Sequence, residues 1–202
     1  MVRRHGLSAM PAGSRLIGPG TMDIAILGGG HGCHAAAADL SEQGHRVRFW
    51  RRDRVALESL REAGGITLKD AAGSRRVALH RVCDDIAEAV RGAELIVLPT
   101  PATAQSDIAR WMAPHLSDGQ VVFLAPGTLG SVLMARWARD AGSHARVAWA
   151  ETGTLPYLAR LHGPHEVNVT IRAVRLPTGV YPLKDAARAL QVIGAAYPSV
   201  HA

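Results

Sequence analysis

Residues 23–40 read DIAILGGGHGCHAAAADL, and this stretch decides the fold. The apolar run Ile24–Leu27 is too short for a helix and predicts a buried strand. Glycines follow directly, and the small residues after them predict a helix that runs to about Gln43 before Gly44 ends it. A strand, a glycine turn and a helix N-terminus in this order present free backbone N–H groups to an anion. We interpret the turn as the diphosphate site of a dinucleotide; the alternative is a glycine-rich turn without a ligand.

The glycine spacing supports a dinucleotide site with one departure from the usual pattern. Gly28 and Gly30 fit the first two positions of G-x-G-x-x-G, and Cys33 occupies the third. A small thiol there still permits close packing of helix and strand. Cys33, Ala36, Ala37 and Leu40 fall on one helical stripe, which we expect to face the sheet. The expected phosphate contacts are Gly28, Gly29, Gly30, His31, Gly32 and Cys33.

Size and composition predict one globular domain. The chain has 202 residues, of which 48% are hydrophobic. No apolar run reaches the roughly 18 residues of a membrane span, so we expect no membrane partner. Its two cysteines, Cys33 and Cys83, lack a C-x-x-C spacing. We therefore expect no metal site and no disulfide framework, and a reducing cytoplasm is the expected location.

The positive charge is concentrated near the amino terminus. The net charge is +6, and Arg3, Arg4 and Arg15 lie in the first 22 residues, which contain no acidic residue. The rest of the chain has 20 basic and 17 acidic residues and no basic run interleaved with aromatics, so we expect no nucleic-acid partner. Residues 1–21 are expected to be a disordered tail, with the true start near Met22.

The second strand ends in residues that bear on coenzyme choice. His45–Trp50 alternates polar and apolar residues, and Arg51 and Arg52 follow it where an NAD site usually places Asp or Glu. A guanidinium can pair with a 2′-phosphate, which favours NADP(H) over NAD(H). Asp53 comes later and is expected to cap a helix over 54–63. The alternative is that the two arginines form an exposed surface pair.

Strands and helices alternate through the rest of the chain, which predicts an α/β, Rossmann-type, doubly wound and mostly parallel sheet. Ligands collect at the strand ends of such sheets, so Pro99, Thr100, Pro126 and Gly127 are expected near the ribose and nicotinamide. Glu166–Arg172 is expected to be an edge strand. The other expected elements are strands at 95–98, 121–124 and 147–150, a hairpin of 66–68 and 76–79, and helices at 85–91, 102–112, 129–141 and 183–195.

Several loops resemble the opine dehydrogenase family (octopine and nopaline dehydrogenases). The matching segments are Gly28–His34 with 38–40, Ala125–Thr128, Glu151–Tyr157 with Arg160, and 176–179 with 181–182. The glycine motif is shared with ketopantoate reductase and glycerol-3-phosphate dehydrogenase, whereas Glu-Thr-Gly-Thr-Leu-Pro-Tyr is the specific part. The family commonly has Asn where this chain has His31. A neutral imidazole there can donate to phosphate, and a solvent-facing histidine is the alternative.

The resemblance implies an enzyme that reductively condenses an amino acid with a 2-oxo acid by hydride transfer from NAD(P)H. Thr128, Thr152 and Tyr157 would then border the nicotinamide and the substrate. Such enzymes have a second, all-helical domain with an Asn-Pro-x-x-His-Pro segment, which this sequence lacks. We therefore assign no catalytic residue to the chain. We expect a coenzyme domain at 22–182 and the start of a truncated linker or second domain at 183–202.

Because the sequence lacks the Asn-Pro-x-x-His-Pro segment of the helical domain, three alternatives remain. The chain could be a truncated reading frame, a subunit that works with a separate helical-domain subunit or as a homodimer, or a non-catalytic dinucleotide-binding remnant or sensor. A ketopantoate reductase-like or glycerol-3-phosphate dehydrogenase-like oxidoreductase is the rival within enzymes.

Overall fold

The computed structural model describes residues 20–202, so nearly all of the expected tail at 1–21 lies outside the described residues. Within this described part, twelve strands and six α-helices follow in order. The strands are β1 (Asp23–Leu27), β2 (Arg46–Trp50), β3 (Ile66–Asp70), β4 (Gly73–Val77), β5 (Arg81–Val82), β6 (Leu95–Leu98), β7 (Val121–Leu124), β8 (Ala148–Thr152), β9 (Tyr157–Leu161), β10 (Glu166–Arg172), β11 (Leu176–Tyr181) and β12 (Val200–His201).

The helices lie between these strands. They are α1 (His31–Glu42), α2 (Arg54–Glu62), α3 (Ile86–Val90), α4 (Ala102–Met112), α5 (Gly130–Asp140) and α6 (Ala186–Ala196), with short 3-10 turns at Ala113–His115 and Leu183–Asp185. None of the helices within the described part of the chain is long and apolar enough to cross a bilayer.

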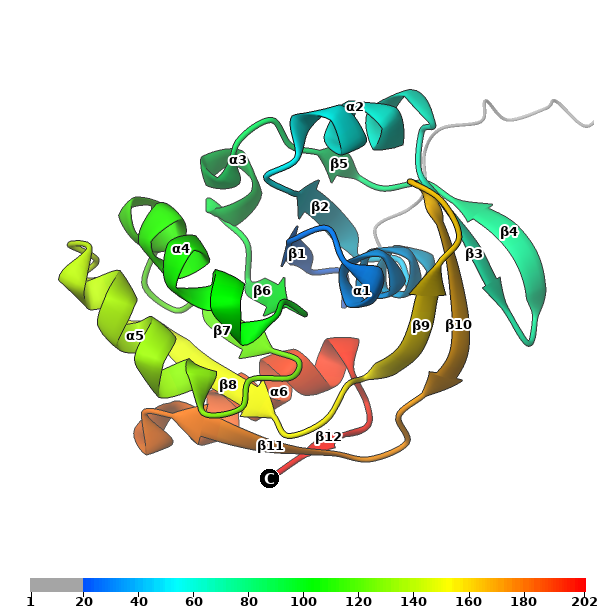
Figure 1. The fold of residues 1–202 in the computed structure, drawn as a ribbon. Helices are drawn as coiled ribbons and strands as arrows, with labels where there is room; N and C mark the ends of the chain where they lie inside the picture. Colours follow the sequence, from blue (N-terminus) through cyan, green and yellow to red (C-terminus); the bar gives the residue numbers. More distant parts are fainter. Residues whose placement is uncertain (1–19) are drawn as a thin grey trace, which may run out of the picture.

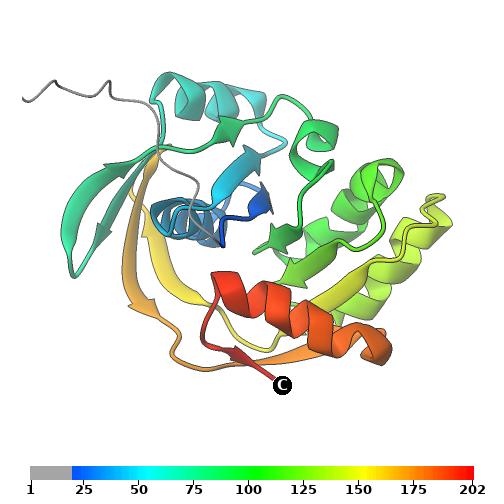
Figure 2. The same ribbon diagram turned by 180° about the vertical axis from the view of Figure 1, so that it is seen from behind.

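The main sheet has the strand order β12-β11-β8-β7-β6-β1-β2-β5. Its pairs are parallel except for β11 against β8. Side chains alternate across it: Ile24 and Ile26 pack with α1 and α6, while Ala25 and Leu27 pack with α3, α4 and α5. Helices thus cover both faces (Figures 1 and 2), which confirms the predicted doubly wound α/β fold.

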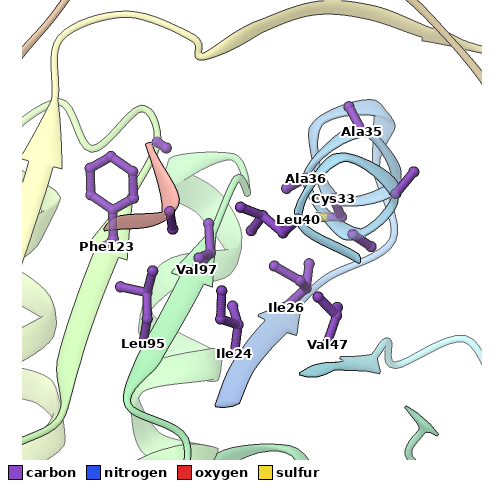
Figure 3. Packing of buried hydrophobic residues seen from close by; sticks show 14 of the residues in the cluster. Ile24, Ile26, Cys33, Ala35, Ala36, Leu40, Val47, Leu95, Val97 and Phe123 are labelled. Atoms are coloured by element: carbon purple, nitrogen blue, oxygen red, sulfur yellow. The ribbon is translucent and has the colours of Figure 1, made fainter. Parts of the chain in front are cut away.

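A second sheet, of order β4-β3-β10-β9, covers the outer side of α1 (Figure 1). Figure 3 shows Ile24 and Ile26 beneath the helix, with Ala35 pointing to the opposite side. The predicted stripe of Cys33, Ala36, Ala37 and Leu40 is buried, but Ala35 and Ala38 are buried as well because two sheets enclose the helix.

Two sequence expectations need correction. Glu166–Arg172 is not an edge strand, because β10 pairs with β3 on one side and with β9 on the other. Residues 183–202, expected to begin a linker or second domain, pack on the main sheet: Ala189 and Ile193 of α6 lie in its core, and β12 pairs with β11. Tyr197 then packs its ring against Phe123, with the centroids 5.4 Å apart.

Candidate coenzyme site

The glycine turn between β1 and α1 lies at the carboxyl edge of the main sheet. Gly28 has a φ of +123°, and an added Cβ would stand 2.6 Å from Thr100 Cγ2 and 2.9 Å from Cys33 Sγ. At Gly32 an added Cβ would stand 2.9 Å from Pro99 Cβ. Glycine is therefore required at 28 and 32 so that the turn and helix can pack against the end of β6.

Gly30 is free of such packing and faces open space. An added Cβ would meet no atom within 4 Å, although Gly30 is the N-cap of α1. No side chain caps the helix, and its first turn contains no acidic residue. The first N–H groups of α1 and its dipole therefore favour a negatively charged ligand above Gly30.

The His34 side chain binds the backbone carbonyl of Gly30 in this turn. Its Nδ1 lies 3.0 Å from the Gly30 carbonyl oxygen, which also accepts the His34 backbone N–H at 3.2 Å. A carbonyl only accepts hydrogen bonds, so Nδ1 carries the proton. Burial lowers the pKa of His34, and the nearby Arg51 lowers it further. A neutral, buried imidazole therefore holds the N-cap of α1 in place.

Arg51 lies across the turn rather than at the outer end of β2. A Cβ on Gly29 would stand 2.6 Å from both Cζ and Nε of Arg51. The side chain is 17% exposed, its Nε has no hydrogen-bond partner among the described residues, and its Nη2 lies 3.6 Å from Asp53 Oδ2. A buried guanidinium N–H without a partner, beside free amides, is suited to a phosphate oxygen.

Arg52 and Asp53 occupy different positions beside the same turn. Arg52 is exposed and forms no ion pair within residues 20–202. The Asp53 carboxylate accepts the Ala56 N–H at 3.1 Å, which confirms its predicted role as the N-cap of α2.

These residues line a cleft of about 350 Å³ at the carboxyl ends of β1, β2 and β6. Its far wall is one face of α4, where Trp111 meets Trp50 edge to face with the ring centroids 6.0 Å apart. The buried hydroxyl of Thr100 also has no partner among the described residues. Volume, position and unpaired donors fit the adenosine and diphosphate parts of a dinucleotide.

The cleft brings together seven of the twelve predicted coenzyme contacts, namely Gly28, Gly29, Gly30, Arg51, Arg52, Pro99 and Thr100. The α4 wall was not predicted from the sequence. A signal was present, because Ala104, Ile108 and Trp111 recur at helical spacing directly after Pro99–Pro101. The further lining residues are Trp50, Asp53, Pro101, Thr103, Ala104, Asp107, Ile108 and Trp111.

His31 and Cys33 do not line this cleft. The His31 Nδ1 accepts the Leu161 backbone N–H at 3.0 Å, so the imidazole joins α1 to β9. Cys33 is buried with Sγ 3.6 Å from the Pro99 carbonyl oxygen, and burial raises the pKa of its thiol to about 12. Cys33 therefore packs between the glycine turn and the end of β6, at the position of the third glycine of the motif.

Pro126 and Gly127 lie farther along the same edge, in the loop from β7 to α5. The Gly127 N–H donates to the Thr152 carbonyl at 3.0 Å, and Glu151 fills the space where a Gly127 Cβ would point. Glu151 accepts the Ser131 Oγ hydroxyl at 3.0 Å and its backbone N–H at 3.4 Å. A carboxylate from β8 thus caps α5, a role that was not predicted for Glu151.

The backbone of this loop is strained. Thr128 and Leu129 both have positive φ values, +55° and +65°, although neither is glycine. Their side chains are exposed at the sheet edge. Strain of this kind occurs at ligand sites, and Thr128 is predicted from the sequence to border one.

Tyr157, predicted on the substrate side, is buried between β9 and α1. Its ring is buried, and its hydroxyl donates to Asp39 Oδ2 of α1 at 3.0 Å. Burial, Tyr197 and Asp39 raise its pKa well above the usual value. Thr152 is also buried, with its hydroxyl donating to the Thr154 carbonyl at 2.8 Å. Both residues hold the fold together.

Tyr157 belongs to a polar network that fastens the second sheet to α1. Arg172 of β10 donates to Asp39 and to Asp70, each at 2.8 Å. Arg75 of β4 bridges Asp70, at 2.7 Å, and Glu42. The guanidinium groups of Arg75 and Arg172 hold the pKa of Asp70 well below its usual value. The network fixes the orientation of α1, and hence of the glycine turn at its start.

The fold and the cleft together define a dinucleotide-binding domain of the Rossmann type. Comparison with known proteins then gives the family: the chain belongs to the family described as NAD-dependent glycerol-3-phosphate dehydrogenase N-terminus, which matches residues 23–127, more than half of the chain.

Individual relatives are NAD(P)-dependent dehydrogenases. The chain is 29% identical over 174 residues to an opine dehydrogenase of Arthrobacter sp. (strain 1C), covering 86% of this chain and 48% of that protein. It is 30% identical over 160 residues to a glycerol-3-phosphate dehydrogenase [NAD(P)+] of Pseudomonas entomophila (strain L48), covering 74% of this chain and 43% of that protein. The chain therefore spans about half the length of these curated relatives.

Solved structures show the same fold. Octopine dehydrogenase in complex with NADH and agmatine superposes with a TM-score of 0.72 at 23% identity, over 90% of this chain and 48% of that one. The resemblance to opine dehydrogenases predicted from the sequence is thereby confirmed, as is an NAD(P)-binding domain of this oxidoreductase family.

Proposed function

We propose that this chain is the coenzyme half of an opine-type dehydrogenase and that it prefers NADP(H). The observation that carries the proposal is the cleft, in which the open face of Gly30, the unpaired Nε of Arg51 and the exposed Arg52 converge. When bound, the reduced coenzyme supplies a hydride. The chain's own residues bind and orient it.

The two arginines would act on different phosphates. Arg51 rests on Gly29, next to the free N–H groups of the turn, so it would pair with the diphosphate that NADH and NADPH share. Arg52 lies one residue farther along, exposed and without an ion pair in residues 20–202, so it would pair with the 2′-phosphate. Asp53 caps α2, and this supports the preference for NADP(H) because an acidic residue free to bind the ribose would favour NAD(H).

The proposed substrates are an amino acid and a 2-oxo acid. Similarity to the Arthrobacter opine dehydrogenase extends over 86% of the chain and supports this class. The nicotinamide would lie beside Pro126 and Gly127, with Thr128 toward the substrate. No proton-transferring residue is assigned within residues 20–202, so the acid–base group would come from a separate helical-domain subunit, a further domain or a second copy.

The test is NADPH oxidation by the chain with an amino acid and a 2-oxo acid together, and with each alone. An opine-type enzyme requires both. Oxidation with ketopantoate or dihydroxyacetone phosphate alone would instead favour the ketopantoate reductase or glycerol-3-phosphate dehydrogenase class. Saturable NADPH binding without oxidation in any mixture is the result expected if the acid–base group lies on another domain or subunit, whereas the absence of saturable NADPH binding would contradict the proposal.

A further inference from the structure

The loop from β7 to α5 lies at the carboxyl edge of the main sheet, farther along that edge than the coenzyme cleft. Gly127 is buried in it, whereas Thr128 and Leu129 are exposed and have left-handed φ values of +55° and +65°. Two consecutive residues other than glycine keep such a conformation only where their surroundings hold them. The contacts of Gly127, directly before them, supply that support.

Both polar groups of the Gly127 backbone are hydrogen-bonded. The N–H donates to the Thr152 carbonyl at 3.0 Å, and the carbonyl accepts the Gly130 N–H at 3.0 Å. The first bond joins the loop to the end of β8, and the second joins it to the first residue of α5. The loop is therefore anchored to the sheet and to the helix that follows it.

A side chain of α4 reaches the same Gly127 carbonyl. Gln105 is only 3% exposed, and its Nε2 donates to that carbonyl at 3.4 Å. Its Oε1 fills the space where a Gly130 Cβ would point. Because close packing fixes a side chain this deeply buried, Gln105 holds the loop from a rigid helix.

A side chain of β8 holds the loop from another side. Glu151 fills the space where a Gly127 Cβ would point. The Glu151 carboxylate also accepts the Ser131 hydroxyl at 3.0 Å and the Ser131 N–H at 3.4 Å, so it cannot move without releasing the start of α5. Gly127 thus lies between an amide from α4 and a carboxylate from β8.

The helix α4 connects this loop to the coenzyme cleft. Thr103, Ala104 and Asp107, close to Gln105 in the sequence, line the cleft, whereas Gln105 contacts Gly127. On its other side α4 packs along α5 (Figure 1). One helix therefore forms a wall of the cleft and also fixes the loop.

We propose that Gln105 and Glu151 are positioning residues, which hold the loop of residues 127–129 in the conformation that receives the nicotinamide ring. The inference rests on the proposed function, in which the nicotinamide lies beside Pro126 and Gly127. Each side chain acts through the Gly127 backbone rather than on the coenzyme. A loop that is held in advance does not have to be ordered when the coenzyme binds, so the two residues raise the affinity for the nicotinamide half alone.

Two ligands separate the nicotinamide from the rest of the coenzyme. 2′-Phospho-ADP-ribose has the adenosine, the 2′-phosphate and the diphosphate of NADPH but no nicotinamide. Isothermal titration calorimetry of the full chain measures the affinity of each ligand, and the fluorescence of bound NADPH reports whether its ring is held. The native chain is expected to bind NADPH more tightly than 2′-phospho-ADP-ribose and to enhance NADPH fluorescence.

The native chain alone already distinguishes two failures. If neither ligand binds, the proposed function is overturned, and this inference with it. If both bind with equal affinity and NADPH fluorescence is not enhanced, the chain binds the coenzyme but does not hold its nicotinamide, and only this inference is overturned.

Gln105→Leu removes the hydrogen bond to Gly127 and keeps a side chain of similar size. It is expected to weaken NADPH about tenfold, as for a loop that is competent to bind about a tenth of the time, and to reduce the fluorescence enhancement. The affinity for 2′-phospho-ADP-ribose is expected to be unchanged. An equal loss of affinity for both ligands would overturn the inference.

Gln120→Leu is the matched control, because it also removes a buried glutamine. Gln120 is 4% exposed, and its Nε2 donates to the carbonyls of Val90 and Ala93 at 2.8 and 2.9 Å, away from the loop. This variant is expected to lose stability, as measured by thermal unfolding, and to bind NADPH as the native chain does. Equal weakening of NADPH by Gln105→Leu and Gln120→Leu would mean that Gln105 has only a structural role.

Two variants of Glu151 test the other contact. Glu151→Ala removes the carboxylate beside Gly127 and is expected to weaken NADPH selectively, as Gln105→Leu does. Glu151→Gln keeps the volume and an oxygen that accepts the Ser131 hydroxyl, so most of the NADPH affinity is expected to return. If circular dichroism shows that Gln105→Leu does not fold, this pair decides the question. A folded Glu151→Ala with native affinity for NADPH would overturn the inference.

Discussion

The guanidinium of Arg51 lies over Gly29, where a Cβ would stand 2.6 Å from its Cζ atom. Sequence spacing alone places Arg51 and Arg52 together at the end of β2 as one basic pair. The structure separates them: Arg51 packs on the glycine turn, and Arg52 remains exposed beside the cleft. This separation turns one expectation about coenzyme choice into two distinct predictions.

Replacing Arg51 with Ala is expected to weaken NADH and NADPH alike, by about 1–3 kcal/mol, because a charge-assisted contact to the shared diphosphate is lost. Fluorescence titration with each coenzyme measures the effect. Selective weakening of NADPH by Arg51→Ala would mean that this side chain reaches the 2′-phosphate instead.

Replacing Arg52 with Ala is expected to weaken NADPH by about 1–3 kcal/mol and to leave NADH within experimental error, since only NADPH has a 2′-phosphate. The same titrations measure it, with Arg54→Ala as the matched control. Arg54 is exposed and lies outside the cleft, beside Asp84 at 3.9 Å. Equal loss of both coenzymes in Arg52→Ala would refute the 2′-phosphate role.

Gly30→Asp separates stability from binding at the turn. Gly30 has an extended backbone with φ −81° and space for a side chain, and Asp is a favourable N-cap. We expect thermal stability to be unchanged or slightly raised. NAD(P)H binding should be lost, because two like charges about 4 Å apart repel by roughly 4 kcal/mol at an effective dielectric of 20.

Gly28→Ala is the contrasting variant at this turn. Its Cβ would clash with Thr100 and Cys33, at a positive φ that alanine rarely adopts, so it should lower the melting temperature. If Gly30→Asp destabilised the fold as Gly28→Ala does, or still bound coenzyme, Gly30 would not face the diphosphate.

Tyr157→Phe tests whether Tyr157 stabilises the fold or contacts a ligand. The variant loses the hydrogen bond to Asp39, so the free energy of unfolding should fall by about 0.5–1.5 kcal/mol, as judged by chemical denaturation. Coenzyme affinity should be unchanged. A large change in coenzyme or substrate binding with unaltered stability would restore Tyr157 to the substrate side.

The lowered pKa of Asp70 predicts how the free energy of unfolding depends on pH in acid. Two guanidinium groups lower its pKa in the folded state below the ordinary value of 3.8, so its contribution is fully present above that value. The contribution is lost as the pH falls below about 4 toward the lowered pKa. The free energy of unfolding in urea, measured across this pH range, should fall less steeply with decreasing pH for Asp70→Asn than for the native chain. An equally steep fall in both would contradict the assignment.

The sequence predicted five strands of the main sheet, β1, β2, β6, β7 and β8, because each carries a local signal, whereas the strands β5, β11 and β12 were not predicted. Buried strands such as Leu95–Leu98 and Val121–Leu124 are uninterrupted apolar runs, and helices such as α4 begin directly after a proline turn. The bounds of α4 agree with the prediction because Pro101 and the following helical spacing fix them.

The second sheet was not predicted as a sheet because its pairing is long-range. β10 pairs with β3 about a hundred residues earlier, and β9 directly follows a proline. The role of Tyr157 was missed for the same reason, since its partner Asp39 is 118 residues away. Periodicity within a segment does not reveal which face another sheet will cover.

The central claim is that the Gly28–Gly30 turn of this chain, with Arg51 and Arg52, binds a reduced dinucleotide. Titration of the purified chain with NADPH and NADH, followed by coenzyme fluorescence, tests it most directly. We predict saturable binding of both coenzymes, with NADPH the tighter of the two. The absence of saturable binding by either coenzyme would contradict it.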